Sequence, residues 1–406
     1  MNLPPRTPSR FVIACGGTGG HLYPGLAVAN KLVERGGEVT LLISPKEVDQ
    51  QAVKRASHVE IVTLPAVCLR RRSEIAFVRG FTRSYRLARK LFDWLKPQAA
   101  LAMGGFTSAP PILAAKATGA RTFLHESNTI PGRANRWLSW IVDHGFIGFP
   151  CAASRLRRCS VTVSGTPVRP EFRVRDAASC RAELGLEPDQ PVVLVMGGSQ
   201  GARGVNELVI RALPLLAKAA HEWQWIHLTG TDDASRMQKE YAALNLRAAV
   251  YPFLDRMEYA LGAADAAVTR AGASTLAELA VMRLPAVLVP YPAAIDNHQW
   301  HNAHAYATTG AARLLPQSEA TPEELTRSLL DLVRNEASRQ TMRSALAHWH
   351  CPAAGDEIAD RVLAAVEAAE PRRALRRSIN FCATPPTTSP RPATASAEAV
   401  AEPASV

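Results

Sequence analysis

Short apolar runs, each followed by a glycine-rich turn and a helical pattern, recur along the chain. Residues 10–15 (RFVIAC) lead through GGTGGH into YPGLAVANKLVERG, where apolar positions recur every three or four residues until a glycine. This succession predicts a strand, a tight loop and an amphipathic helix. Further apolar runs follow at 38–44 (EVTLLIS), 99–105 (AALAMGG) and 121–127 (RTFLHES). The alternation favours a mostly parallel sheet covered by helices.

The same pattern starts again near Pro191. Residues 191–213 (PVVLVMGGSQGARGVNELVIRAL) repeat the order of strand, glycine loop and helix. Four more strand candidates follow, namely QWIHLTG (224–230), AAVYPFL (248–254), AAVTRAG (266–272) and PAVLVPY (285–291). Two successive α/β units of similar size predict two facing Rossmann-like domains. A ligand would then bind in the cleft between them, at the carboxyl ends of the strands.

The changes of pattern also predict where the domains end. We expect a first domain at 1–163, a linker at 164–172 (SGTPVRPEF) and a second domain at 173–370. Residues 371–406 are rich in Pro, Ala, Ser and Thr and cannot bury enough apolar area to offset chain entropy. We therefore expect a disordered tail.

The bulk composition fits this organisation. The chain has 406 residues, of which 47% are hydrophobic and 20% charged, and domains of about 100–200 residues suggest two of them. The seven cysteines form no CxxC pair, which favours a reducing compartment over a disulfide framework. We find no signal-peptide pattern at the N-terminus and no apolar run of about 18 residues. The sequence therefore predicts a cytoplasmic protein without a transmembrane helix.

The net charge of +11 is concentrated in two places. Residues 65–96 hold nine Lys or Arg against two acids, and residues 371–406 hold five Arg against two Glu. Such basic segments favour a polyanionic partner, either a nucleic acid or an anionic membrane. Nucleic-acid binding would call for a stacking platform of aromatic side chains or a known module, and the sequence offers neither. We therefore expect an anionic membrane surface and no nucleic acid.

Within the first basic segment, residues 75–96 have the period of a two-faced helix. One face carries Phe77, Phe81, Tyr85, Ala88, Phe92 and Leu95, another carries Arg79, Arg83, Arg86 and Lys90, and Arg70, Arg71 and Arg72 lie just upstream. The apolar stripe has the pattern of an ordinary core-packing helix, and we interpret it so. The basic face is the predicted contact with anionic lipid.

Two glycine loops carry the candidate chemistry. GGTGGH (16–21) lies between a strand and a helix, where backbone N–H groups and the helix N-terminus bind anions. It is not the dinucleotide fingerprint, because Leu22 stands where the third glycine belongs, and a ligand-free tight turn is the alternative. GGSQGA (197–202) repeats the geometry in the second half. Two such loops facing one cleft favour a sugar nucleotide.

The motifs together resemble the MurG family of peptidoglycan glycosyltransferases over about residues 10–365. The segments that carry the resemblance are GGTGGH (16–21), HESNTIPGRAN (125–135), SGTPVR (164–169), GGSQGA (197–202), YPFLDRM (251–257), TRAGASTLAEL (269–279), LVPYP (288–292) and DNHQWHNA (296–303). The resemblance implies a GT-B type fold. It also implies inverting transfer of N-acetylglucosamine from UDP-N-acetylglucosamine to undecaprenyl-pyrophosphoryl-N-acetylmuramyl-pentapeptide, without a cofactor or metal. It further implies a peripheral position on the cytoplasmic face of the inner membrane.

The resemblance also assigns donor-binding residues. They are Thr18, Gly19, Gly20, Asn128, Arg169, Ser199, Leu254, Ala273, Ser274, Thr275, Leu276, Ala277, Glu278 and Gln299. Glu278 can accept hydrogen bonds from both ribose hydroxyls, and the Arg169 guanidinium suits uracil or phosphate oxygens. Ser127 stands where the family usually has glutamine, so the contacts of that side chain are not carried over.

An inverting transfer requires one general base on the acceptor side. His21 is the first candidate, because an imidazole titrates near the working pH, and Glu126 is the second. The alternatives are that His21 binds only the loop or the acceptor and that Glu126 is a buried structural carboxylate. His298, His301 and His304 are spaced like metal ligands, but no acidic cluster completes a site, so we expect no metal.

Two other functions remain open on the sequence. A related transferase that glycosylates membrane diacylglycerol would share the donor residues, and a catalytically inactive scaffold would share the fold. The presence of His21, Glu278 and Gln299 argues against the scaffold. Other cell-wall and division proteins are further partners that the sequence leaves open.

Overall fold

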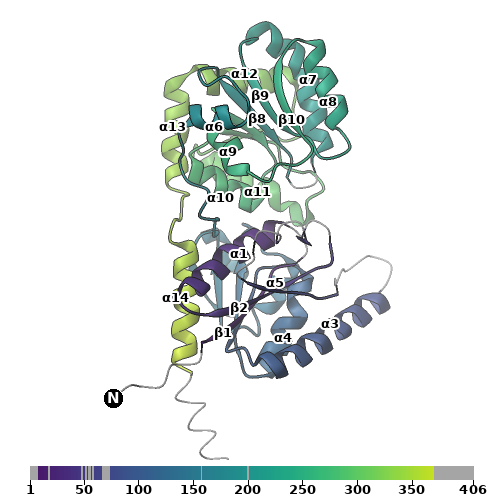
Figure 1. Cartoon of the computed structure of the whole chain (residues 1–406), viewed down its shortest axis with the longest axis vertical. Coiled ribbons are helices and arrows are strands. Elements are labelled where there is room, and N and C mark those ends of the chain that lie inside the picture. The colour runs from purple at the N-terminus through teal and green to yellow at the C-terminus, as the bar shows by residue number, and fades with distance from the viewer. Residues whose placement is uncertain are drawn as a thin grey trace, which may run out of the picture.

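The computed structural model describes residues 8–369 apart from 17–18, 47–48, 51–52, 54–55, 57–58, 66–73, 157 and 199–200. The predicted tail at 371–406 therefore lies outside the described residues. Two α/β domains lie one above the other, each built on its own parallel sheet (Figure 1). This arrangement confirms the predicted fold class of two Rossmann-like halves.

The first domain contains a seven-stranded parallel sheet in the order β3-β2-β1-β4-β5-β6-β7. Its strands are β1 (Arg10–Ala14), β2 (Glu38–Ile43), β3 (Glu60–Thr63), β4 (Ala99–Ala102), β5 (Arg121–Glu126), β6 (His144–Ile147) and β7 (Ser160–Val163). Its helices are α1 (Gly19–Glu34), α3 (Glu74–Leu95), α4 (Ala109–Ala117) and α5 (Arg133–Leu138), with 3-10 turns η1 (Phe106–Ser108) and η2 (Pro150–Arg155).

Strand β1 explains how this sheet is covered on both faces. Phe11 and Ile13 pack into the core that contains Leu22 and Leu32 of α1. Val12, which lies between them in the strand, packs into the core on the opposite face of the sheet, which contains Phe92 of α3. Successive side chains of a strand point to opposite faces, so an unbroken apolar strand requires helices on both sides.

The second domain contains a six-stranded parallel sheet in the order β10-β9-β8-β11-β12-β13. Its strands are β8 (Val192–Met196), β9 (Gln224–Leu228), β10 (Arg247–Tyr251), β11 (Ala266–Thr269), β12 (Ala286–Leu288) and β13 (Arg313–Leu314). Its helices are α6 (Ala177–Glu183), α7 (Arg203–Ala219), α8 (Ala234–Ala243), α9 (Met257–Ala263), α10 (Ala273–Met282), α11 (His298–Thr308), α12 (Pro322–Arg334) and α13 (Glu336–Ala347), with the 3-10 turn η3 (Ile295–Asn297).

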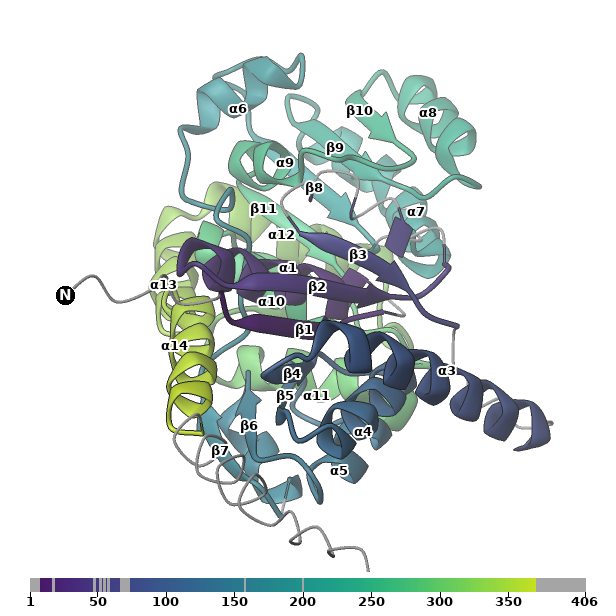
Figure 2. The same ribbon diagram turned by 60° about the horizontal axis from the view of Figure 1, so that its bottom comes forward.

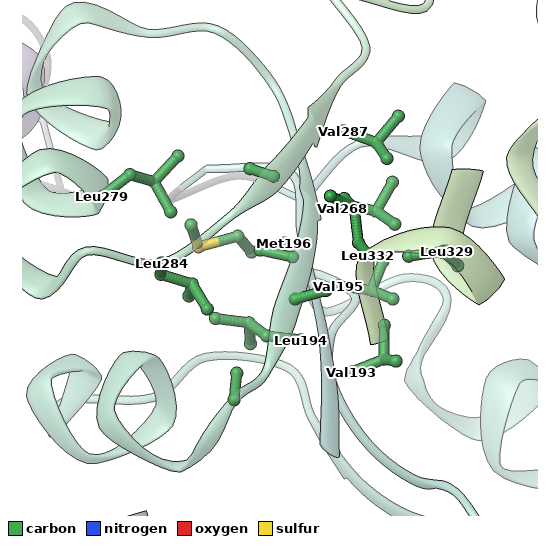
Figure 3. Close-up of a cluster of buried hydrophobic side chains, with 14 of the residues drawn as sticks. Val193, Leu194, Val195, Met196, Val268, Leu279, Leu284, Val287, Leu329 and Leu332 are labelled. Atoms are coloured by element: carbon green, nitrogen blue, oxygen red, sulfur yellow. The ribbon is translucent and has the colours of Figure 1, made fainter. Parts of the chain in front are cut away.

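The core of the second domain has the same two-sided construction. Figure 3 shows Val193 and Val195 of β8 pointing toward Leu329 and Leu332, on one side of the sheet. On the other side, Leu194 and Met196 point toward Leu279 and Leu284. Alternate residues of one strand thus fix α12 and α10 on opposite faces, which sets the position of the α10 N-terminus.

The last helix, α14 (Ala354–Glu367), leaves the second domain and packs on the first (Figures 1 and 2). Ile358 and Val362 belong to the same core as Phe11, and Arg35, which directly follows α1, pairs with Asp356 at 2.9 Å and Asp360 at 2.7 Å. The sequence prediction placed all of 173–370 in the second domain. The apolar face of α14 is instead buried against α1, so the chain crosses between the domains twice.

Candidate active site

A cavity of about 700 Å³ opens between the two domains, at the carboxyl ends of strands from both sheets. It is lined from the first domain by the α1 N-terminus, by the glycines after β4 and by the end of β5, and from the second domain by residues after β8, β10 and β11. Of the predicted site residues, it brings together Gly19, Gly20, His21, Glu126, Asn128, Arg169, Leu254, Ala273, Ser274, Thr275, Glu278 and Gln299. Thr18 and Ser199 lie outside the described residues.

The His21 imidazole lies on the first-domain wall of this cavity. Its Nδ1 is shielded from solvent and has no hydrogen-bond partner among the described residues. Burial lowers the His21 pKa, and the negative charge of Glu126 opposes that shift. The ring is therefore held in its neutral form, which can accept a proton.

Gly104, in the turn after β4, makes room for this imidazole. Its φ is +116°, and an added Cβ would lie 2.6 Å from the His21 Cε1. A side chain at this position would force the ring out of its place. The sequence analysis did not single out Gly104 as a site residue, because the contact joins two segments far apart in the chain.

Glu126, the second candidate base, has its oxygens occupied. Its Oε1 accepts from the backbone N and the Nδ2 of Asn128 at 2.9 and 3.0 Å. Its Oε2 accepts from the Gly132 N at 2.9 Å and the Asn135 Nδ2 at 3.0 Å. A buried carboxylate with four donors organises the loop between β5 and α5, and this geometry favours the structural interpretation of Glu126.

Asn128 connects that loop to the second domain through a hydrogen bond. The Asn302 Nδ2 of α11 donates to the Asn128 Oδ1 at 3.0 Å, and the Asn302 Oδ1 accepts from the Thr129 N and Oγ1 at 3.0 and 2.9 Å. Asn302 is fully buried. In the sequence, Asn302 was only part of the DNHQWHNA segment (296–303), whereas in the structure it forms a hydrogen-bonded bridge between the domains.

The Arg169 guanidinium occupies the hinge of the cleft. It lies 4.1 Å from the ring centroid of Tyr23 on α1 and 4.8 Å from that of Phe172. It pairs with Glu171 at 3.2 Å and faces Glu278 of α10 at 4.0 Å. The Tyr23 ring in turn lies against Gly19, where an added Cβ would meet it at 3.3 Å. Arg169 thus joins the first glycine loop to the start of α10.

Helix α10 presents only part of the predicted segment to the cleft. The side chains of Ser274, Thr275 and Glu278 line the cavity, and the Ser274 Oγ donates to the Gly20 carbonyl at 3.1 Å. Leu276 instead packs in the core of the second domain. Ala277 lines a separate cavity behind the helix. A helical period allows one face of the segment to reach the cleft, so neither of these two side chains can contact a ligand there.

On the second-domain wall, Glu278 is the group whose pKa is shifted most. Burial raises its pKa to about 7, and the positive charge of Arg169 opposes the rise. Gln299, further along this wall, accepts from the Tyr291 N through its Oε1 at 2.9 Å. The wall therefore offers the Glu278 carboxyl group and the Gln299 Nε2 donor beside the N-terminus of α10.

The histidines of α11 do not form a metal site in the part of the chain that the structure describes. His298 lines the cleft, and its Nδ1 lies 2.8 Å from the Ile295 carbonyl. His304 stacks on Trp300 with ring centroids 4.8 Å apart.

Comparison with known proteins identifies the class to which this fold and cleft belong. Residues 11–147 match the glycosyltransferase family 28 N-terminal domain, and residues 192–356 match the C-terminal domain of that family. The crystal structure of Acinetobacter baumannii MurG is similar with a TM-score of 0.68 and 28% identity, covering 88% of this chain and 99% of that one. The chain is a two-domain glycosyltransferase.

Curated relatives narrow the class further. The UDP-N-acetylglucosamine–N-acetylmuramyl-(pentapeptide) pyrophosphoryl-undecaprenol N-acetylglucosamine transferase of Synechocystis is 35% identical over 366 residues, which cover 89% of this chain and 98% of the relative. The transferase of the same name from Moorella thermoacetica is 35% identical over 374 residues, covering 88% and 99%. The chain belongs to this family of N-acetylglucosamine transferases, as the sequence resemblance predicted.

Replacing Glu278 with Gln should change how stability depends on pH. The folded protein keeps the Glu278 proton up to about pH 7, whereas an unfolded chain releases it near the ordinary value of 4.5. The carboxyl group therefore stabilises the fold fully below pH 4.5, and this contribution is lost as the pH rises through 7. Denaturant unfolding without ligand should show the wild type losing stability relative to Glu278→Gln across this window. A difference independent of pH would contradict the assignment.

Proposed function

We propose that the protein transfers N-acetylglucosamine, with inversion, from UDP-N-acetylglucosamine to the 4-hydroxyl of muramic acid in undecaprenyl-pyrophosphoryl-N-acetylmuramyl-pentapeptide. The observation that carries the proposal is the cleft itself, in which the neutral His21 imidazole faces the N-terminus of α10 and Glu278 across the domain boundary. The names of the curated relatives support this donor and acceptor.

The donor binds on the second-domain wall in this proposal. Backbone N–H groups at Ala273 to Thr275 meet the diphosphate, because the first turn of a helix has unpaired donors and a partial positive charge. As the sugar–phosphate bond breaks, negative charge grows on the leaving UDP, and these fixed donors stabilise it. Glu278 accepts the ribose hydroxyls, and Arg169 remains close enough to balance its charge.

The acceptor hydroxyl binds on the first-domain wall. His21 takes its proton while the oxygen attacks the anomeric carbon from the face opposite the departing UDP. The negative charge of the Glu126 carboxylate stabilises the resulting imidazolium, in line with its opposing influence on the His21 pKa. Gly104 holds the ring in position.

Glu278→Ala tests the donor site directly. Loss of hydrogen bonds to a charged group costs about 1.5–3 kcal/mol, so the affinity for UDP-N-acetylglucosamine should fall roughly 10- to 150-fold. Calorimetry with the folded variant measures this change, and circular dichroism controls for the fold. Wild-type donor affinity in the folded variant would remove Glu278 from the donor site.

His21→Ala tests both the reaction and the base. With radiolabelled UDP-N-acetylglucosamine and a short-chain acceptor analogue, the wild type should transfer the sugar, and the variant's turnover should fall by about 10²–10⁴-fold. Donor affinity should stay unchanged. Because burial lowers the His21 pKa, the acidic limb of the wild-type pH–rate profile should lie below the ordinary imidazole value and vanish in the variant.

Three outcomes of this assay would contradict the proposal in different ways. A raised acceptor KM with unchanged turnover and pH profile would make His21 a binding residue. Transfer to diacylglycerol in place of the muramyl acceptor would change the acceptor class. Donor binding without transfer to either acceptor would indicate a scaffold.

We further propose that the protein docks on the cytoplasmic face of the inner membrane through α3. The basic side chains Arg79, Arg83, Arg86 and Lys90 are exposed on it, and α3 runs along the outside of the first domain (Figure 1). Exposed apolar residues lie beside them, among them Ile75 and Trp94. No helix among the described residues is long and apolar enough to cross a bilayer. Arg70, Arg71 and Arg72 lie outside the described residues.

Replacing Arg83, Arg86 and Lys90 with Gln tests the docking surface. Each basic residue near an anionic surface contributes about 1 kcal/mol, so binding to phosphatidylglycerol-containing vesicles should weaken roughly 100-fold. Transfer to a water-soluble acceptor should survive. A control variant with the same charge loss on the second domain, Arg211, Lys218 and Lys239 to Gln, should bind vesicles like the wild type. Equal binding by both variants, or binding insensitive to salt, would contradict the assignment.

A further inference from the structure

A second cavity of about 360 Å³ lies on the outer side of the first domain, between α3, η1 and α5. We call it the outer pocket, and its walls include Phe77, Phe81, Phe106, Ala109, Ala134 and Trp137. The Phe77 ring meets that of Phe106 edge-on at 5.8 Å and lies 6.0 Å from that of Phe81. The lining is almost entirely apolar, and its volume is in the range of pockets that hold small organic ligands.

The outer pocket departs from the sequence interpretation of α3. That interpretation assigned the whole apolar stripe to the core. The structure confirms it for Ala88, Phe92 and Leu95, and the half-buried Tyr85 and Phe81 also pack against this core. Phe77 and Phe81, two turns or more toward the helix start, are only half-buried and line the open pocket. Apolar surface that the fold leaves uncovered in this way marks a binding site for an apolar group.

The outer pocket adjoins the reaction cleft. Phe106 and Ala134 line both cavities. Phe106 directly follows Gly104 and Gly105, and Gly104 is the residue against which the His21 ring packs. The Thr107 Oγ1 donates to the Gly16 carbonyl at 2.6 Å and ties this turn to the first glycine loop. One continuous wall therefore leads from the proposed base to the aromatic pocket.

The chemical groups of the proposed acceptor follow one another in an order that matches this wall, from His21 to the outer pocket. Its reacting hydroxyl belongs to a sugar, the diphosphate follows, and the apolar polyprenyl chain begins at the diphosphate. With the hydroxyl at His21, the start of the chain is the part of the acceptor that an apolar pocket beside the cleft can receive. Val78 and Trp137 at the rim are 59% and 48% exposed, so the pocket is open on its outer side and a longer chain can leave it there.

We propose that the outer pocket binds the first isoprene units of the acceptor's polyprenyl chain. This inference rests on the proposed function and adds to it a site for the lipid part of the substrate. The branched, flat isoprene units bury their surface against the rings of Phe77, Phe81 and Trp137, and apolar burial favours binding in proportion to the area removed from water. The remainder of the chain stays in the bilayer on which α3 docks.

The test uses two soluble acceptor analogues without vesicles or detergent micelles. Both carry the diphosphoryl muramyl-pentapeptide, one ending in a methyl group and the other in a geranyl chain. For the wild type, kcat/KM should be at least about 10-fold higher for the geranyl analogue, the size of effect that apolar contacts produce. Phe81→Ala should reduce this ratio toward one while leaving the methyl analogue and the donor affinity unchanged. Val78→Trp, which fills the pocket from its exposed rim, should do the same without creating a cavity.

Trp94→Ala is the matched control, since Trp94 is an exposed aromatic residue on the same helix outside the outer pocket. It should keep the wild-type ratio. A wild-type ratio of one, or a ratio that survives both Phe81→Ala and Val78→Trp, would overturn the inference while leaving the transfer reaction intact. If these variants lose only vesicle binding and keep the chain preference, the pocket holds a membrane acyl chain instead, which also overturns it.

A binding measurement tests the inference independently of the proposed function. Farnesyl diphosphate should bind the wild type more tightly than methyl diphosphate, and Phe81→Ala should abolish the difference, whether or not either analogue is a substrate. Absence of transfer to both analogues would contradict the proposed function. Equal affinity for the two diphosphates would contradict the outer pocket as an isoprenoid site.

Discussion

The stacking of Arg169 on Tyr23 beside Glu278 is the contact on which the geometry of the cleft depends. Arg169 belongs to the segment between β7 and α6, Tyr23 to α1 and Glu278 to α10, so one guanidinium touches three parts of the molecule that carry the site. The pair with Glu278 is long, at 4.0 Å, and the buried Arg169 Nε has no hydrogen-bond partner among the described residues. A buried charge that is incompletely paired leaves capacity for an anionic ligand, which would complete its interactions.

The other contacts between the domains are partly polar and partly apolar, since the Phe149 ring after β6 lies 6.1 Å from the Tyr306 ring and 5.3 Å from the Trp349 ring of the second domain. Asn302 holds Asn128, Ser274 donates to the Gly20 carbonyl, and each hydrogen bond of this kind contributes about 0.5–1.5 kcal/mol. Interfaces between domains permit relative motion unless they are large and hydrophobic. The return of α14 to the first domain, where Ile358 is fully buried, limits that motion on the side away from the cleft.

The sequence predicted what is encoded locally. The central strands β1, β8 and β11 are short, mostly apolar runs, so they could be recognised in the sequence. The glycine loops could be recognised too, because each is also a short run of consecutive residues. Strand β7 (SVTV) is an edge strand without a buried residue, and β13 has two residues, so neither carries a periodic signal. The contacts of Gly104 with His21, of Tyr23 with Arg169 and of Asn302 with Asn128 join distant segments, and no local pattern reports them. Leu276 belongs to the predicted donor-binding segment, and only the structure shows that its side chain packs in the core of the second domain.

Helix α3 explains why the same periodic signal can have two structural outcomes. Its apolar stripe runs from Phe77 to Leu95, but the domain beneath it is shorter than the helix, and α3 reaches outward beyond the sheet (Figure 2). The C-terminal turns, with Phe92, therefore close the core, while the first turn, with Phe77, remains over the gap between η1 and α5. The hydrophobic period of a sequence predicts which face of a helix is apolar. It does not predict how much of that face the rest of the domain covers. The surplus of apolar surface lies beside the basic face and next to the proposed acceptor wall of the cleft. The membrane docking and the acceptor recognition that we propose therefore both require a helix longer than the domain beneath it.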